Sequence, residues 1–196
     1  MLGWSRGASD LPRAAPGSLG AVIIAYKTDK VSSYSKVRFK TRQHYDAMLA
    51  RIDKAYGDTP LSDIKARTIH EWHAEWAKDG KIAMAHQLVV MLRMLFSFGL
   101  AYLENEDCER MSVVMSKLRF ENSKPRTEHL TAEQAIAIRA AAHKAGRHSL
   151  ALAQAIQFDC MLRQKDVIGE WVPIEEPGIT DITYAHEKWL RGIRWE

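Results

Sequence analysis

Long apolar runs, cysteine and proline are all scarce in this sequence of 196 residues, and each scarcity excludes a class of protein. No apolar stretch approaches the ~18 residues that a transmembrane helix needs, so we expect no membrane association. The two cysteines, Cys108 and Cys160, are too few and too far apart for a disulfide framework, and a cytoplasmic location is expected. The N-terminal segment has no continuous apolar core and does not predict a secretory signal.

Motifs for metals, nucleotides and nucleophilic catalysis are also missing. The sequence contains no Gly-rich phosphate loop and no nucleophile elbow, so we expect no cofactor. His70 and His73 lie three residues apart, whereas a zinc-binding helix motif needs four and a third ligand. We therefore expect no metal site. Hydrophobic residues make up 46% and charged residues 27% of the chain, which excludes collagen-like and mostly disordered proteins.

The charge is distributed unevenly along the chain, although the net charge is only +4. Residues 1–128 hold 20 basic and 15 acidic side chains, whereas residues 129–196 hold 8 and 9. Residues 27–54 alone hold 8 basic and 3 acidic side chains. A local excess of this kind is typical of a phosphate-binding surface, and a solvated helix face rich in lysine gives the same pattern.

Hydrophobic periodicity predicts a mainly α-helical first domain over residues 18–119. A disordered N-terminal segment, residues 1–17, is predicted before it from its Gly, Pro, Ala and Ser content. Within the domain, the spacing of apolar residues predicts helices over 18–29, 41–56, 66–78, 82–103 and 106–118. Ser18 is the expected N-cap of the first helix. The apolar faces of the first four helices are formed by Leu19, Val22, Ile23, Tyr26, Tyr45, Met48, Leu49, Ile52, Tyr56, Ile69, Trp72, Trp76, Leu88, Met91, Leu92, Leu95 and Phe96.

A polar stretch without apolar periodicity, residues 120–128, predicts an interdomain linker before a second domain over residues 129–196. Thr131 and Gln134 form a capping box that starts a helix ending near Lys144, and a second helix is predicted over 149–162. After Ile168 the pattern predicts a long irregular loop and one strand without a partner.

An arginine in the second domain is the sharpest local signal. Arg163 follows a strongly apolar predicted helix, and Asp166 lies three residues further on. Because an unpaired buried charge is costly, the guanidinium needs a partner. Either Arg163 and Asp166 form a structural ion pair, or Arg163 faces an open site and binds a phosphate or carboxylate.

The order of these features resembles the tyrosine recombinases, or phage integrase family. Residues 161–167 read Met-Leu-Arg-Gln-Lys-Asp-Val and resemble the first catalytic box, G-L-R-x-x-E/D-L/V, with methionine where glycine is usual. Similarity to the core-binding domain is carried by Tyr26, Thr41, Tyr45, Gly57, Pro60-Leu61 with Ile64, and the helix around Leu92–Phe96. The resemblance covers about residues 18–196.

The resemblance implies a SAM-like core-binding domain of four or five helices, then a linker and the first helices of an α+β DNA breaking-rejoining domain. Arg163 would contact the scissile phosphate and stabilise its charge during phosphoryl transfer, and Asp166 would support it. The intact enzyme would integrate or recombine DNA through a 3′-phosphotyrosine without a metal. Its partner would be double-stranded DNA at attachment-type sites, on which the family assembles as a tetramer.

The later elements of the family pattern are missing from this chain. No histidine after Arg163 begins an H-x-x-R box, and Tyr184, the one tyrosine that follows, comes too early for the nucleophile. We therefore interpret Tyr184 as a loop residue and expect a truncated recombinase that cannot complete strand cleavage alone. The alternative is a non-catalytic helical DNA-binding or adaptor protein.

The resemblance also suggests which basic residues contact the DNA backbone, since helices of this domain clamp the duplex in the family. Such contacts position a protein more than they read sequence. The main candidates surround the start of the second predicted helix, whose free N–H groups also attract phosphate: Lys36, Arg38, Lys40, Thr41 and Arg42. Further candidates are Arg67 and Thr68 at the start of the third predicted helix, and Lys81 and His86 near the start of the fourth.

Overall fold

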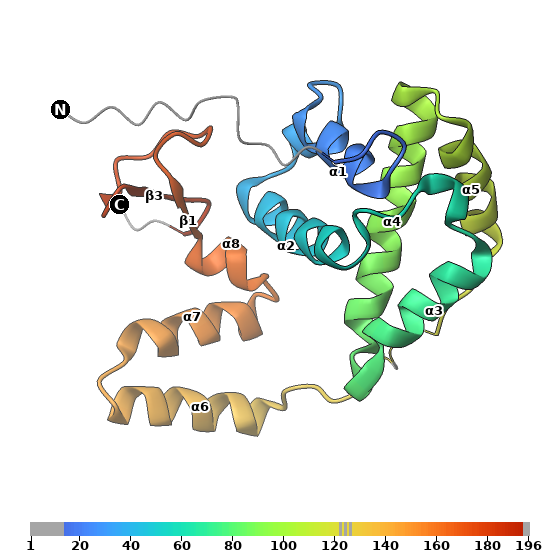
Figure 1. Cartoon of the computed structure of the whole chain (residues 1–196). Coiled ribbons are helices and arrows are strands. Elements are labelled where there is room, and N and C mark those ends of the chain that lie inside the picture. The colour runs from blue at the N-terminus through green and yellow to red at the C-terminus, as the bar shows by residue number, and fades with distance from the viewer. Residues whose placement is uncertain (1–13, 122, 124, 126, 194–196) are drawn as a thin grey trace. The chain divides into compact units, whose positions relative to one another are not determined.

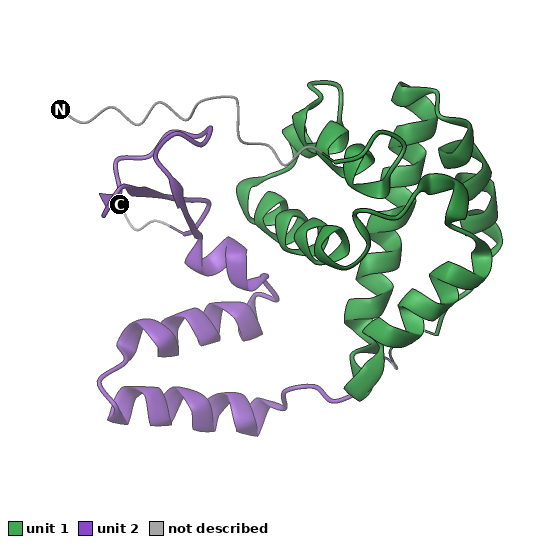
Figure 2. Cartoon of the chain, viewed as in Figure 1, with its two compact units in different colours: residues 1–124 green, residues 125–196 purple. Residues whose placement is uncertain are grey.

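The computed structural model describes residues 14–121, 123, 125 and 127–193, which form a mainly α-helical chain with one small sheet. The chain divides into two compact units, residues 1–124 and 125–196 (Figure 2), and the division falls within the predicted linker. Of the predicted disordered segment, residues 1–13 lie outside the described residues. Gly17 is fixed, because its carbonyl accepts a hydrogen bond from the Leu61 N–H at 2.9 Å.

The elements of unit 1 follow the predicted order closely (Figure 1). They are α1 (Leu19–Thr28), η1 (Ser33–Lys36), α2 (Phe39–Tyr56), η2 (Leu61–Asp63), α3 (Ala66–Trp76), η3 (Lys78–Gly80), α4 (Ile82–Leu103) and α5 (Glu106–Lys117). The predicted cap of α1 is confirmed, since the Ser18 hydroxyl accepts the Ala21 N–H at 3.3 Å.

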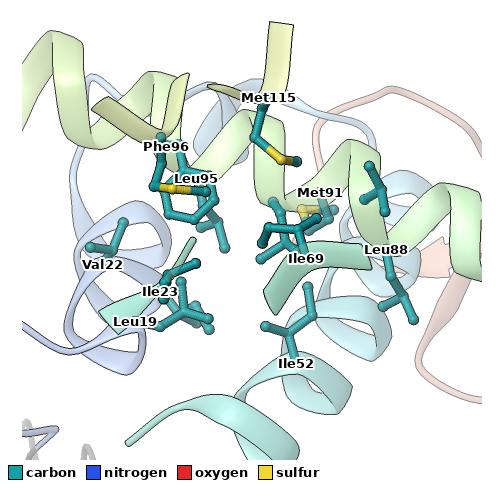
Figure 3. Close-up of a cluster of buried hydrophobic side chains, with 14 of the residues drawn as sticks. Leu19, Val22, Ile23, Ile52, Ile69, Leu88, Met91, Leu95, Phe96 and Met115 are labelled. Carbon is teal, nitrogen blue, oxygen red and sulfur yellow. The ribbon is translucent and has the colours of Figure 1, made fainter. Parts of the chain in front are cut away.

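The core of unit 1 is built from the apolar faces that the periodicity predicts. Figure 3 shows side chains of α1, α2, α3, α4 and α5 meeting in one cluster. The predicted residues that are buried in it are Leu19, Val22, Ile23, Tyr26, Leu49, Ile52, Ile69, Trp72, Trp76, Leu88, Met91, Leu92, Leu95 and Phe96. Burial of this much apolar surface is the main stabilising contribution to the unit.

α4 is the central helix of unit 1 and contacts α1, α2, α3 and α5 (Figure 1). It is long and apolar enough to cross a membrane by length and composition, and half of its most apolar window is buried within the structure. Helices α1, α2, α3 and α5 cover it with apolar side chains, which is the arrangement of a core helix in a soluble protein.

Unit 2 contains α6 (Ala132–Lys144), α7 (His148–Asp159), α8 (Gln164–Ile168), β1 (Glu170–Pro173), β2 (Thr183–Tyr184) and β3 (Glu187–Leu190). The predicted capping box of α6 is confirmed. The Thr131 hydroxyl accepts the Gln134 N–H at 3.3 Å, and the Gln134 side chain accepts the Thr131 N–H at 3.0 Å. The buried apolar side chains of this unit are few and mostly small: Ala135, Ala151, Val167 and Val172.

α7 ends three residues earlier than predicted. Cys160 is its C-cap, and Met161 then adopts a left-handed backbone conformation with φ 54°. A residue in this conformation cannot continue a right-handed helix. The chain therefore leaves the helix before Arg163, and Cys160 is exposed.

The predicted unpaired strand is wrong, because β1, β2 and β3 form an antiparallel sheet with the order β1-β3-β2. The predicted irregular loop is confirmed only over residues 174–182, between β1 and β2, which contain no helix or strand. β3 pairs with β1 through Trp171 and Trp189, and with β2 through Tyr184 and Glu187. Tyr184 therefore lies in a strand rather than a loop, and its side chain is exposed. β3 hydrogen-bonds on both edges, so the strand that we expected to lack a partner has two. Residues 194–196, the end of that predicted strand, lie outside the described residues.

Candidate nucleic-acid interface

The main candidate surface surrounds the start of α2. Lys36 ends η1, Arg38 is the N-cap of α2, and Lys40, Thr41 and Arg42 lie in its first turn. The side chains of Lys36, Arg38 and Lys40 are exposed, and none forms an ion pair with any described residue. We call these three residues the α2 basic surface.

The segment that leads into the α2 basic surface is held firmly on α1 and α2. The Tyr34 hydroxyl donates to the Asp46 carboxylate at 2.7 Å, and Lys27 pairs with the same carboxylate at 2.7 Å. Burial, followed by this hydrogen bond, raises the pKa of Tyr34 to about 12, so its hydroxyl stays a donor. The Tyr26 and Tyr34 rings also meet edge to face at 5.9 Å. These contacts fix the backbone that carries Lys36 and Arg38.

α2 begins two residues earlier than predicted, at Phe39 rather than Thr41. Its cap residue, Arg38, provides no side-chain acceptor, while the Arg42 N–H already donates to the Arg38 carbonyl at 2.8 Å. The N–H groups of residues 39–41 precede the first intrahelical hydrogen bond and have no acceptor within the helix. The basic side chains and the positive end of the helix thus coincide, as the sequence predicts.

The candidates at the start of α3 have different surroundings. Arg67 is exposed, whereas Thr68 is half-buried and its hydroxyl accepts the Lys65 N–H at 3.2 Å. Because this bond satisfies a backbone donor at the helix start, Thr68 has a local structural role. Only Arg67 of this pair presents its side chain fully to a ligand.

The two candidates near the start of α4, Lys81 and His86, also differ in how exposed they are. Lys81 is exposed and pairs with Asp79 at 3.1 Å. His86 is half-buried, and its Nδ1 atom is buried without a hydrogen-bond partner. Arg67 lies at the start of α3 and Lys81 follows its end, and the nine residue steps from Arg67 to Trp76 span about 14 Å along the helix. The candidates therefore do not form one continuous patch.

Two cations that sequence reasoning missed accompany Lys81. Arg51 and Lys54 lie one turn apart on the C-terminal half of α2, and they line the same depression as Lys81. Lys78 also lines it. The i, i+3 spacing of Arg51 and Lys54 was the available signal, because residues three apart share a helix face.

His86 belongs to a histidine cluster beneath the segment that leaves α5. The rings of His70 and His73 lie 4.9 Å and 4.7 Å from the Phe120 ring. Burial lowers the pKa of His73, His70 and His86 lower it further, and Glu121 opposes them. The Nε2 atom of His73 is buried without a hydrogen-bond partner. His70 and His73 therefore pack against the Phe120 ring.

We expect unit 1 to lose stability in mild acid because of His73. Its folded-state pKa lies below the ordinary value of 6.5, so the unfolded chain takes up the proton more readily. The free energy of unfolding is then unaffected well above pH 6.5 and falls as the pH drops below it. Urea titrations at pH 7 and pH 5 measure this, and His73→Gln reduces the difference. An identical difference in the variant contradicts the assignment to His73.

Arg163 and Asp166 lie at the start of α8, where the structure corrects the sequence interpretation. Arg163 is the N-cap of this short helix rather than the end of an apolar helix, and both side chains are exposed. No ion pair joins them, so the predicted structural pair is absent. The neighbouring Lys165 and Arg191 instead pair with Glu170, at 3.8 Å and 3.0 Å. The Arg163 guanidinium is therefore accessible and is not a buried charge that needs compensation.

Met161, two residues before Arg163, has a backbone conformation that glycine favours. Its φ of 54° lies in the left-handed region, which costs a residue with a Cβ about 1 kcal/mol relative to glycine. Its side chain is 90% exposed, so little packing depends on it. The chain thus makes the turn before Arg163 that a glycine would favour.

Met161→Gly is expected to stabilise unit 2 by about 0.5 kcal/mol. The substitution relieves the left-handed strain, and the greater freedom of glycine in the unfolded chain offsets part of that gain. Thermal denaturation of the variant beside the parent chain measures the effect, and Leu162→Gly is a matched control. A loss of stability in Met161→Gly equal to that of the control contradicts the argument.

No family model, no curated protein and no solved structure matches this chain. Its function is therefore inferred from the residues and their chemistry.

Proposed function

We propose that this chain is the DNA-binding part of an integrase-type site-specific tyrosine recombinase, and that unit 1 binds the backbone of duplex DNA. The observation that carries the proposal is the α2 basic surface. Lys36, Arg38 and Lys40 are exposed, have no ion pair with any described residue, and lie on a firmly held segment. Cations placed in this way bind phosphates without first breaking an internal ion pair.

The acidic residues near this surface do not neutralise it. Asp46 already binds Lys27 and Tyr34, both at 2.7 Å. Asp29 accepts the backbone N–H of Val31 at 3.0 Å. Neither carboxylate pairs with Lys36, Arg38 or Lys40, so the charge of the α2 basic surface is not cancelled. A concentrated positive potential both steers a duplex toward the protein and retains it.

Unit 2 would supply the first catalytic arginine. The accessible guanidinium of Arg163 offers a planar set of donors that matches two phosphate oxygens. In phosphoryl transfer such a group stabilises the negative charge that develops on the non-bridging oxygens. The left-handed turn at Met161 supports this role, because the family motif has glycine there.

A salt series with short duplexes of several sequences tests the proposal. We expect the logarithm of the affinity to fall linearly with the logarithm of salt, with a slope of about −3 for three neutralised phosphates. The sequences should differ little, since backbone contacts dominate. The absence of binding at low salt, or an affinity independent of salt, contradicts the proposal. Affinity that is unchanged by Arg163→Ala favours the alternative of a non-catalytic DNA-binding protein.

A further inference from the structure

A second basic feature lies at the C-terminal end of α2, away from the α2 basic surface. It is an open depression of about 760 Å³ between α2, the end of α3 and the turn that leads into α4. Four cations and two aromatic rings contribute to its lining, with two carboxylates and two alanines. They are Arg51, Lys54, Lys78, Lys81, Tyr56, Trp76, Glu75, Asp79, Ala50 and Ala55.

The charges of this depression do not cancel. Lys78 pairs with Glu75 at 2.5 Å, and Lys81 pairs with Asp79 at 3.1 Å. Both carboxylates are therefore neutralised within the lining. Arg51 contacts the sulfur of Met84 but no described carboxylate, and Lys54 has no ion pair among the described residues. Two positive charges remain available to an anion.

The aromatic side of the depression is rigid. The Tyr56 ring stacks on Trp72 at 4.0 Å with an interplanar angle of 14°, and it meets Trp76 edge to face at 5.7 Å. Trp72 and Trp76 are both buried, so Tyr56 rests on a fixed surface. Burial and the charge of Glu75 raise the pKa of Tyr56, which keeps its hydroxyl protonated and able to donate.

We propose that this depression binds a phosphorylated ligand of nucleotide size, with the phosphate held by Arg51 and Lys54 and the sugar or base against Tyr56 and Trp76. Arginine and lysine one turn apart offer several donors to phosphate oxygens. Aromatic rings provide a surface for a base or sugar without selecting its sequence. The two available charges match the charge that a phosphate monoester carries near neutral pH.

The site is separate from the surface of the proposed function. Lys40 and Lys54 are 14 residues apart on α2, which corresponds to about 21 Å along the helix. The phosphate can come from a free mononucleotide or from the backbone of a nucleic acid chain. The two sources share the same chemistry at Arg51 and Lys54, and the arms of the experiment separate them.

Calorimetric titration of the full chain with adenosine 5′-monophosphate tests the site, with adenosine as the control that lacks a phosphate. We expect the nucleotide to bind in the millimolar range or tighter and adenosine to bind at least tenfold more weakly. Arg51→Ala and Lys54→Ala should each weaken nucleotide binding about fivefold or more. Lys117→Ala, which removes an exposed lysine from α5, should leave it unchanged. Circular dichroism confirms that each variant is folded.

A second arm uses duplex DNA. If the mononucleotide does not bind but Lys54→Ala weakens duplex affinity and makes the salt slope shallower by about 1, the ligand is a backbone phosphate. If neither ligand responds to Arg51→Ala or Lys54→Ala, the inferred site is overturned. Failure of the proposed function gives a result different from failure of this site. In that case, changes at Lys36, Arg38 and Lys40 do not alter the affinity for duplex DNA.

Discussion

Replacement of Lys36, Arg38 and Lys40 by glutamine is expected to lower the affinity for duplex DNA about 500-fold at 0.1 M salt. Each neutralised phosphate contributes about 0.9 to the slope of log affinity against log salt. Three lost contacts therefore remove about 2.7 logarithmic units between a 1 M reference and 0.1 M salt. The slope itself should become shallower by about 3. Fluorescence anisotropy of a labelled duplex measures both quantities.

The matched control for this prediction removes the same charge from positions outside the α2 basic surface. Lys117, Lys144 and Arg147 are exposed and form no ion pair with described residues, and their replacement by glutamine changes the net charge equally. We expect that control to reduce affinity less than tenfold, because net charge acts only at long range and is screened by salt. An equal loss in the two triple variants means that binding follows net charge and not the α2 basic surface.

The triple variant should not alter the stability of unit 1. The three side chains are exposed and form no ion pair with described residues. The one contact that their replacement removes is that of Lys40 Nζ with the neighbouring Phe39 ring, 5.3 Å from its centroid and at an exposed position. Surface substitutions of this kind change the free energy of unfolding by about 0.5 kcal/mol or less. An unchanged urea midpoint therefore shows that lost binding comes from the surface and not from unfolding.

The helices of unit 1 could be predicted because their apolar faces are long and regular. In α1, α3 and α4 the apolar residues recur over several turns, and a helix with such a face must bury it. Caps made by Ser18 and Thr131 could also be identified, since their hydroxyls act on neighbouring N–H groups within four residues. Both kinds of signal are local or periodic, and both are confirmed.

The second unit was predicted less well because its elements are short. β2 has two residues, and β1 and β3 have four each. An alternation of apolar and polar residues cannot repeat often enough in such short strands to be recognised. The pairing of β3 with β1 joins residues about 20 apart, and no local pattern shows it. α7 was extended too far because apolar residues continue past Asp159, while the turn at Met161 depends on a backbone angle that methionine rarely adopts.

Only the part of the candidate surface that is formed by residues close together in sequence could be proposed from the sequence. Lys36, Arg38 and Lys40 are close in sequence, so their shared surface follows from the start of α2. The depression at Arg51 and Lys54 depends on the packing of α2 against residues 75–81, which is a tertiary contact. The role of Arg163 stays a prediction, and its expected burial is wrong, because the apolar helix before it ends at Asp159.

An arginine that no motif identifies, Arg110 of α5, is expected to be among the most important residues for the stability of unit 1. Its guanidinium donates to the carbonyl of Leu61 at 3.0 Å and to the carbonyl of Ile64 at 3.0 Å. It also pairs with Asp107 at 2.9 Å. Leu61 and Ile64 are buried, so Arg110 connects η2 to α5 through two carbonyl groups at buried residues. The Leu61 carbonyl also accepts the Ile64 N–H at 3.2 Å.

Arg110→Met is expected to lower the free energy of unfolding by about 3 kcal/mol. Methionine keeps much of the apolar stem but removes two charge-assisted hydrogen bonds, each worth about 1.5–3 kcal/mol, and partial solvent access offsets some of the loss. The ion pair with Asp107 adds little, because both side chains are over a third exposed. Urea unfolding followed by the fluorescence of Trp72 and Trp76, which are buried in the same unit, measures the change.

Arg119 provides a matched control for Arg110 within the same unit. Its guanidinium also donates to two carbonyls, those of Ser116 at 2.9 Å and Leu118 at 3.1 Å, but at exposed positions. Water replaces the arginine there, so Arg119→Met should cost about 0.5 kcal/mol or less. Equal losses in the two variants contradict the argument, because they mean that the position of the accepting carbonyls does not matter. A large loss confined to Arg110→Met shows that α5 stabilises η2 through this side chain.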